Sequence, residues 1–231
     1  MARALNLAGL HCELSELFAS EAPDHRDKIR HALKRSISSS SAGNSIDNLD
    51  SLLDVKMLPR LPHQAVSISH CPSLGGFVHL AKNKSFLAIG FDIEIANRVS
   101  VAVARKVLPH SSELFLRTLV DVESEDQAED RAEVPAIAAC IWAAKESAIK
   151  SIGNALANSL VDQQIFYGNL ALTEFASAGD RTCFHFRAGL TDSVTSMGAE
   201  RGIEARGIVQ KNDQWILALA ISYSLPAGLE Q

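Results

Sequence analysis

The residues with the clearest chemical potential are two acidic side chains within an apolar segment. In "LAIGFDIEIANR", Asp92 and Glu94 lie two positions apart. Side chains alternate across a β-strand, so both carboxylates are expected on the same face as Gly90, with Phe91 facing the other way. Like charges at such positions repel each other, and burying them without a partner is costly. A bound cation would resolve both problems, and carboxylate oxygens suit Mg²⁺. The alternative, an edge strand with a solvated polar face, is favoured from these two residues alone.

A second set of charged residues lies on a segment with the pattern of a helix, "VPAIAACIWAAKESAIKSIG" (134–153). Between Pro135 and Ile152 the charged residues are Lys145, Glu146 and Lys150. One apolar stripe runs along it at spacings of three and four, formed by Ile137, Ile141, Ala144, Ala148 and Ile152.

The opposite side of this predicted helix combines small and charged residues. It carries Ala139 and Ala143 beside Glu146 and Lys150, so the helix is expected to pack on more than one side. Its charged residues would then face a lined cleft. Glu146 and Lys150 are four positions apart, which places them about 40° apart around the axis. The alternative is a surface ion pair, which contributes only a few tenths of a kcal/mol.

A third feature is the segment "SISH" at the end of an apolar strand pattern. Ser69 and His70 are adjacent there. A histidine in this position is more often a structural hydrogen-bonding residue than a ligand. As a functional pair, a hydroxyl and an imidazole can hold a phosphate. A serine hydrolase is disfavoured because the chain has no G-x-S-x-G nucleophile elbow.

The elements that must position these residues follow from hydrophobic periodicity and from turn residues. Helices are predicted over 10–35 (one or two), 99–108, 111–120 and 134–153, with Pro135 in the first turn of the last and Gly153 at its end. Strands are predicted over 65–70, 75–81, 85–95, 163–172, 181–188, 203–211 and 214–222, with the first two forming a hairpin. Exposed loops are predicted over 36–48 and 121–133, and 56–64 is a proline-rich lead-in. This pattern predicts an α+β fold.

Bulk composition excludes several classes of protein. The 231 residues are 47% hydrophobic and 21% charged, as in ordinary globular domains, and the net charge of −5 gives no overall basic surface for nucleic acid. Four widely spaced cysteines suggest reduced thiols. The N-terminus is a poor signal peptide, and no apolar run is long enough to span a membrane. We therefore expect a cytoplasmic protein.

Taken together, three motifs in this order resemble those of the 4′-phosphopantetheinyl transferases. "SISHC" (67–71) resembles an S-x-S-H strand, "GFDIE" (90–94) a G-[IV]-D-[IVL]-E strand, and "WAAKESAIK" (142–150) a W-x-x-K-E-[SA]-x-x-K helix. Phe91 departs from the usual Ile or Val. "KMLPRLP" resembles the lead-in before the first motif but lacks the usual Gly before Lys56. The resemblance covers about residues 56–153.

The resemblance implies an activity and a fold. These enzymes move the 4′-phosphopantetheine group of coenzyme A onto a serine of an apo acyl or peptidyl carrier protein, and adenosine 3′,5′-bisphosphate leaves. The long monomeric subgroup folds as two similar halves related by a pseudo-twofold axis, with the active site between them. We therefore expect residues 1–84 to form an N-terminal half that contributes to coenzyme A binding. Residues 85–231 would form a C-terminal half with the metal site and the catalytic helix.

The resemblance also implies roles for individual residues. Asp92, Glu94 and Glu146 would hold Mg²⁺. Glu146, or a metal-bound water, would accept the proton of the carrier serine, and Lys150 would stabilise the departing bisphosphate. Coenzyme A phosphates would contact the remaining candidates, which are Lys56, Ser69, His70, Lys145 and Lys150.

Two basic regions are further candidates. One or more of the N-terminal residues Lys28, Arg30, Lys34 and Arg35 would assist coenzyme A binding. An acidic carrier protein would dock on Arg98, Arg105, Lys106 and Arg117, although a solvated helix face is an equally good interpretation. We expect no membrane or nucleic-acid partner. Two other functions stay open: a different metal-dependent phosphodiester enzyme, and a non-catalytic protein that binds coenzyme A or a carrier protein.

Overall fold

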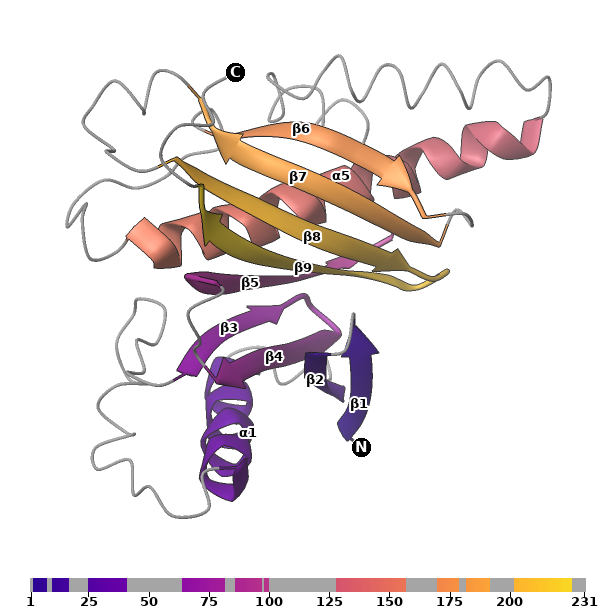
Figure 1. Cartoon of the computed structure of the whole chain (residues 1–231). Helices are drawn as coiled ribbons and strands as arrows, with labels where there is room; N and C mark the ends of the chain where they lie inside the picture. The colour runs from indigo at the N-terminus through magenta and orange to yellow at the C-terminus, as the bar shows by residue number, and fades with distance from the viewer. Residues whose placement is uncertain are drawn as a thin grey trace.

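The fold is α+β, with two antiparallel sheets and two helices in the described part of the chain (Figure 1). A computed structural model describes residues 2–7, 10–16, 25–40, 64–81, 86–96, 98–99, 128–156, 170–178, 182–191 and 202–225. Among these residues, no helix is both long and apolar enough to cross a membrane. The predicted α+β class is confirmed.

The first sheet has four strands in the order β1-β2-β4-β3. These strands are β1 (Ala2–Leu7), β2 (Leu10–Glu16), β3 (Gln64–His70) and β4 (Leu74–Ala81). Helix α1 (His25–Ser40) covers one face through Ile29, Leu33 and Ile37, which pack with Val66 and Phe77. A polar contact supports this packing, because the two ring nitrogens of His79 lie 3.0 Å from Ser36 Oγ and 3.1 Å from Gln64 Oε1.

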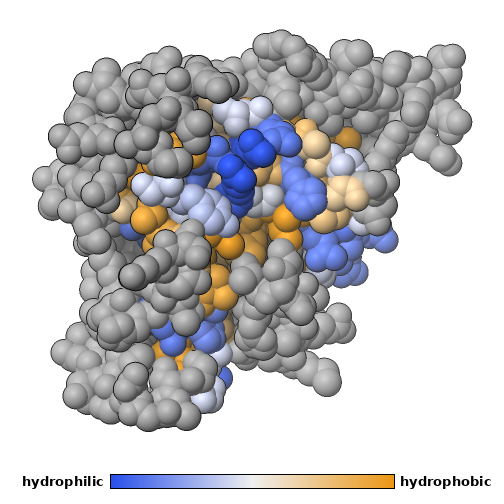
Figure 2. Space-filling view, viewed as in Figure 1, coloured by the Kyte–Doolittle hydropathy of each residue, from blue (hydrophilic) through white to orange (hydrophobic). Residues whose placement is uncertain are grey.

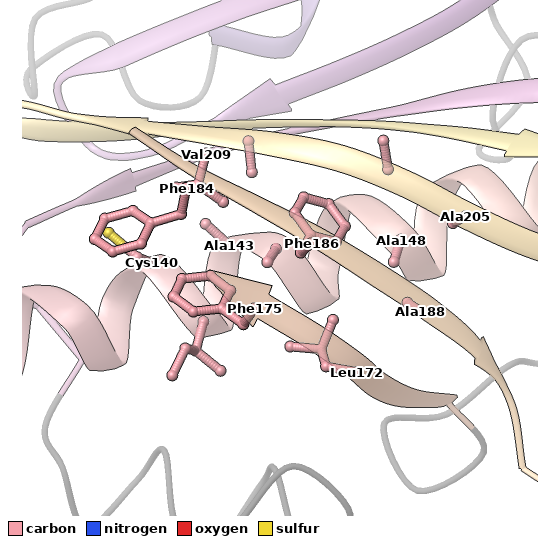
Figure 3. Packing of buried hydrophobic residues seen from close by; sticks show 14 of the residues in the cluster. Cys140, Ala143, Ala148, Leu172, Phe175, Phe184, Phe186, Ala188, Ala205 and Val209 are labelled. Atoms are coloured by element: carbon pink, nitrogen blue, oxygen red, sulfur yellow. The ribbon is translucent and has the colours of Figure 1, made fainter. Parts of the chain in front are cut away.

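The second sheet has five strands in the order β5-β9-β8-β7-β6. They are β5 (Ala88–Ile95), β6 (Leu170–Ser177), β7 (Cys183–Leu190), β8 (Ile203–Lys211) and β9 (Trp215–Ser224). Helix α5 (Ala128–Leu156) crosses one face of this sheet. Figure 3 shows Phe175, Phe184 and Phe186 of the sheet against Cys140 and Ala143 of the helix. The small helix residues let the aromatic rings fill the space between the two layers.

The two sheets meet at β5 and β9. Ile89, Phe91 and Ile93 of β5 are buried with Leu217 and Leu219 of β9, and from the first sheet Ala65, Cys71, Leu74 and Val78 join the same cluster. The other face of the first sheet is covered by α1, and the other face of the second by α5. Strand β5 therefore packs against the first sheet on one face and against α5 on the other.

The part of the second sheet beyond this contact carries charges in pairs. Arg187 lies 3.0 Å from Glu174, and Arg206 pairs with Glu204. In Figure 2 hydrophilic residues gather over the five-stranded sheet, and hydrophobic residues lie below them where the sheets meet. Among the described residues of this face, each of these two arginines therefore has an acidic partner.

Most of the predicted elements are confirmed. The hairpin of β3 and β4 pairs in register from Gln64–Ala81 to His70–Gly75. Strand β8 has the predicted limits, and β5, β7 and β9 differ from prediction only at their ends. The predicted strand 163–172 overlaps β6 at 170–172, and residues 163–169 lie outside the described residues. Cys71 is a free cysteine, as expected.

The N-terminal prediction of helix over 10–35 is wrong for its first part. Residues 10–16 form β2, which lies between β1 and β4. Leu10, Cys12 and Leu14 alternate with polar residues, which is the period of a strand. The predicted loop at 36–48 is also wrong for 36–40, where Ile37 is fully buried and keeps α1 helical.

Helix α5 is longer than predicted at both ends. The predicted acidic loop is helical over 128–133, where Ala, Glu and Arg are good helix formers. Pro135 consequently lies inside the helix, which loses one backbone hydrogen bond without ending. Gly153 does not end the helix either, because the buried Leu156 continues the apolar side one turn further. The predicted helices 99–108 and 111–120 lie outside the described residues, apart from Val99, as do 41–48, 56–63 and 121–127.

Candidate active site

Helix α5 and strand β5 are in backbone contact because Gly90 has no side chain. A Cβ atom at this position would lie 1.8 Å from the backbone oxygen of Ser147. Such a distance is impossible, so only glycine permits this approach. Asn154 strengthens the contact by donating from Nδ2 to the Ile89 carbonyl at 3.2 Å. The glycine of the "GFDIE" segment therefore sets the distance between the strand and the helix.

This close approach brings Lys150 of α5 onto Asp92 of β5. Lys150 Nζ lies 2.6 Å from Asp92 Oδ1, and it also donates to the Phe91 carbonyl at 3.0 Å and to Ser69 Oγ at 3.1 Å. An ammonium group has three hydrogens, so these three bonds use its full donor capacity. The carboxylate is nearly buried, with 6% of its side chain exposed. The structure thus joins β3, β5 and α5 through one lysine.

Ser69 of β3 completes this cluster. Its hydroxyl donates to Asp92 Oδ1 at 2.9 Å and accepts from the Ile93 backbone N–H at 3.2 Å. The bond from Lys150 is its third contact. Three residues predicted as separate site residues, Ser69, Asp92 and Lys150, therefore lie in direct contact although up to 81 positions separate them in the sequence.

Two carboxylate oxygens beside this cluster are buried without a hydrogen bond. They are Asp92 Oδ2 and Glu94 Oε2. Arg98 Nη1 lies 3.9 Å from Glu94 Oε2, which is too long for a hydrogen bond. Burying a charged oxygen without a hydrogen bond is costly. A ligand that binds these two oxygens would remove this cost, so they are candidate ligand-binding atoms in the described part of the chain.

Glu146 lies close enough to this cluster for its acidity to change. Burial raises the pKa of Glu146 from 4.5 to about 7, and the negative charge of Asp92 adds to the effect. The positive charge of Lys150 opposes the rise, and Glu94 contributes to it weakly. Burial, followed by Asp92, also raises the pKa of Glu94. Both shifts come first from burial and then from the charge of Asp92, which indicates that the three carboxylates lie close together.

The donor set fits a hard cation in its chemistry. Carboxylate oxygens are the preferred ligands of Mg²⁺, and two of those here are buried without a hydrogen bond. A cation would also offset the negative charge of Asp92, which adds to the effect of burial in raising the pKa of Glu146. Within the described ranges, no three His, Cys, Asp or Glu side chains converge closely enough to hold an ion in their present positions. Binding would therefore require side-chain movement of at least one of the three carboxylates.

Lys145 does not join this cluster. Its side chain is fully buried, and Nζ has no hydrogen-bond partner. Burial alone lowers the pKa of Lys145 from 10.5 to about 8. Successive residues of a helix point about 100° apart, so Lys145 and its neighbour Glu146 lie on different sides of α5.

The other predicted residues lie outside the cluster of Ser69, Asp92 and Lys150 or outside the described residues. His70 ends β3 with an exposed side chain, next to Ser69. Lys56 lies outside the described residues, as do the predicted carrier contacts Arg105, Lys106 and Arg117. Of the N-terminal basic residues on α1, Arg30 lies 3.6 Å from Asp27. Arg98 is 56% exposed beside Glu94, on the side of the candidate site.

Ser67 and Asn154 hold the backbone of β5 beside the cluster without belonging to it, and the sequence analysis did not select them. Ser67 Oγ accepts the backbone N–H of Phe91 at 2.8 Å. The repeated serine in "SISH" was the available signal, since positions two apart share a strand face. Asn154 carried no such signal, because its contact with β5 depends on the extension of α5 beyond Gly153.

Comparison with known proteins adds no assignment, because no protein-family model and no curated protein matches the chain.

Proposed function

We propose that the chain is a 4′-phosphopantetheinyl transferase. It would move this group from coenzyme A to a serine of an apo acyl or peptidyl carrier protein and release adenosine 3′,5′-bisphosphate. One observation carries the proposal: Lys150 Nζ bonds both Ser69 Oγ and Asp92 Oδ1. The three motifs that resemble this family lie far apart in the sequence, and this lysine brings them into one cluster. Segments that resembled the family motifs only by chance would not be expected to lie together in the fold.

The proposal includes two similar halves with the active site between them. The predicted boundary between 1–84 and 85–231 falls between the end of β4 at Ala81 and the start of β5 at Ala88. The cluster draws Ser69 from the first sheet, and Asp92 and Lys150 from the second sheet and its helix. A site built from both halves is consistent with this organisation.

Asp92, Glu94 and Glu146 are the residues that would hold Mg²⁺. The buried oxygens of Asp92 and Glu94 that lack a hydrogen bond support this assignment, as does the negative charge of Asp92 close to Glu146. When bound, Mg²⁺ would neutralise negative charge on the pyrophosphate of coenzyme A. His70, Lys145 and Lys56 remain proposed phosphate contacts, and the buried side chain of Lys145 would have to turn towards the cluster to reach a phosphate.

Glu146 is the proposed general base. The hydroxyl oxygen of the carrier serine forms a bond to the β-phosphorus of coenzyme A, and its proton passes to the Glu146 carboxylate. The bond from this phosphorus to the bridging oxygen breaks, and its electron pair leaves on adenosine 3′,5′-bisphosphate. A pKa of about 7 gives a carboxylate that is a better proton acceptor than an ordinary glutamate at neutral pH.

Lys150 is the proposed partner of the leaving group. Its ammonium lies within the cluster and is partly exposed, at 22% of the side chain. Positive charge placed where negative charge develops lowers the barrier. To contact the bisphosphate, Lys150 would exchange one of its three protein partners for a phosphate oxygen, and its bond to the Phe91 carbonyl is the contact that leaves Asp92 and Ser69 undisturbed.

Transfer of a labelled arm tests this function and its alternatives. The protein is incubated with Mg²⁺, apo acyl carrier protein and coenzyme A whose thiol carries a fluorophore, and the carrier is examined on a denaturing gel. We expect a fluorescent carrier band that EDTA abolishes. Cleavage of DNA without coenzyme A would support another phosphodiester enzyme. Binding of labelled coenzyme A without a carrier band, across several carriers, would support a non-catalytic binding protein.

A further inference from the structure

Two serine hydroxyls replace a neighbouring strand along the free edge of β5. On its other side β5 pairs with β9. On this side the backbone N–H of Phe91 donates to Ser67 Oγ at 2.8 Å, and that of Ile93 donates to Ser69 Oγ at 3.2 Å. Residues two apart on a strand lie about 6.6–6.8 Å apart, so the two serines match the two N–H groups. We call Ser67 and Ser69 the serine pair.

The serine pair is buried, with Ser67 at 0% and Ser69 at 6% exposure. Unpaired N–H groups at a buried strand edge would be costly, and the two hydroxyls accept both of them. A hydroxyl differs from the carbonyl of an ordinary neighbouring strand because it can also donate a hydrogen. At Ser69 this hydrogen goes to Asp92 Oδ1, at 2.9 Å.

The hydroxyl of Ser69 is therefore fully used. It has one hydrogen and two lone pairs. The hydrogen goes to Asp92, and the lone pairs accept from the Ile93 backbone and from Lys150. A phosphate would have to displace one of these bonds inside a nearly closed site. This arrangement favours a role for Ser69 other than the phosphate contact that the family resemblance implies.

The geometry points to Ser69 as a positioning residue for the carboxylate of Asp92. Ser69 and Lys150 both bind Oδ1, and this leaves Oδ2 as the buried oxygen without a partner. Fixing one oxygen determines the direction of the other, which is the oxygen offered to a cation. The inference rests on the proposed function for the role of the cation, whereas the link from Ser69 to Asp92 and Lys150 does not depend on it.

A matched pair of variants tests this role. Ser69→Ala and Ser67→Ala each remove one hydroxyl that accepts from β5, but only Ser69 contacts Asp92 and Lys150. Mn²⁺ affinity is measured by electron paramagnetic resonance with coenzyme A present and no carrier. Hydrogen bonds to charged groups contribute about 1.5–3 kcal/mol, so we expect Ser69→Ala to weaken Mn²⁺ binding about 10-fold or more. Ser67→Ala should change it less than about twofold. Equal effects in both variants would overturn the inference.

The ratio of the kcat/KM values for coenzyme A and for its 3′-dephospho form distinguishes a positioning role of Ser69 from a phosphate-binding role. A positioning residue lowers transfer from both forms by the same factor, so Ser69→Ala should keep the wild-type ratio of the two kcat/KM values. A residue that contacts the 3′-phosphate would instead lose the preference for coenzyme A. Loss of this preference in Ser69→Ala would overturn the inference and restore the phosphate role.

A measurement without metal keeps this test separate from the proposed function. In EDTA, urea unfolding midpoints are compared for Ser69→Ala, Lys150→Met and the double variant, with Ser67→Ala as the control partner. Residues in contact give non-additive effects. We expect non-additivity for Ser69 with Lys150 and additivity for Ser67 with Lys150. If Ser69→Ala does not fold, Ser69→Cys keeps the volume with a weaker hydrogen-bonding group. Additivity for Ser69 would overturn the inference even if transfer is observed, and failure of transfer alone would leave this coupling intact.

Discussion

At the level of single residues, the candidate site holds charges that the fold buries without full compensation. Asp92 has one oxygen bound twice and one without a hydrogen bond, Lys145 is buried without any partner, and burial raises the pKa of Glu146 to about 7. Perturbed groups of this kind concentrate at functional sites, although structural ion pairs also produce them. Such groups lower stability, so their substitution should increase it where their function is not required.

Glu146→Gln should remove activity and increase stability together. The pKa of Glu146 is raised from 4.5 to about 7, so the folded state prefers the protonated form. The stabilisation from this proton is complete below pH 4.5 and is lost as the pH rises through 7. In EDTA, the variant should therefore gain at most about 3 kcal/mol over wild type at pH 8 and little at pH 4.5, measured by urea unfolding. Transfer should fall at least about 100-fold. A loss of stability at pH 8 would contradict the buried position of Glu146.

Lys145→Met should stabilise the protein at neutral pH. Burial lowers the pKa of Lys145 from 10.5 to about 8, so the folded state binds the proton of Lys145 less tightly than the unfolded state does. Stability is lost as the pH falls from 10.5 through 8, and the full penalty is present at pH 7. The variant should gain at most about 3 kcal/mol at pH 7, and less at pH 10. Unfolding in urea at both pH values measures this gain. Lower stability of the variant at pH 7 would show that the ammonium has a partner.

At the level of elements, the sequence identified those whose periodicity is local. The alternation of "SISH" and "GFDIE" and the apolar stripe of 134–153 were sufficient to locate β3, β5 and α5. The strand at 10–16 was missed, because its three alternating apolar residues are few and its partners come from elsewhere in the chain. The ends of α5 were missed because Pro135 and Gly153 are weaker signals than the packing of Leu156 and the contact of Asn154.

The candidate site was predictable as a set of residues but not as a geometry. The motifs named Ser69, Asp92 and Lys150, and the structure brings them into contact. Nothing in the local sequence indicated that Ser69 would satisfy the edge of β5, because this depends on how two sheets meet. Nothing indicated that Lys145 would turn away from its neighbour Glu146 into a buried position without a partner.

Two glycines test the contact between β5 and α5. Gly90→Ala should cost several kcal/mol, about 4 or more, because the new Cβ would meet the backbone of Ser147 at 1.8 Å and that of Ser151 at 2.5 Å. Gly153→Ala is the control within α5, since its Cβ would have no neighbour within 4 Å. Alanine in an unobstructed helix position should raise stability by about 0.5–1 kcal/mol. Urea unfolding measures both, and a Gly90→Ala protein as stable as wild type would contradict the close approach.

At the level of the whole molecule, two exposed arginines differ in how closely an acidic side chain pairs with them. The outer face of the second sheet pairs its charges, with Arg187 3.0 Å from Glu174. Arg98 lies at 3.9 Å from Glu94 and is 56% exposed next to the candidate site. An acidic carrier would therefore be attracted to Arg98 more than to Arg187.

Matched arginine variants test this difference. Arg98→Ala should raise the KM for the carrier protein about threefold or more, and Arg187→Ala, which starts from a similar exposure of 48%, should leave it unchanged. Steady-state transfer at varied carrier concentration measures the effect, with the KM for coenzyme A as the internal control. An equal response of both variants would place carrier docking elsewhere.

The most direct test of the central claim is the mass of the carrier protein. Apo acyl carrier protein is incubated with the chain, coenzyme A and Mg²⁺, and its intact mass is measured, in parallel with EDTA and with the Asp92→Asn protein. We expect the carrier to gain one phosphopantetheine group, with no gain in EDTA and almost none with Asp92→Asn. An unchanged mass across several carriers, from a folded protein that binds coenzyme A, would show that the protein is not this transferase. An equal gain with Asp92→Asn would contradict the proposed metal site.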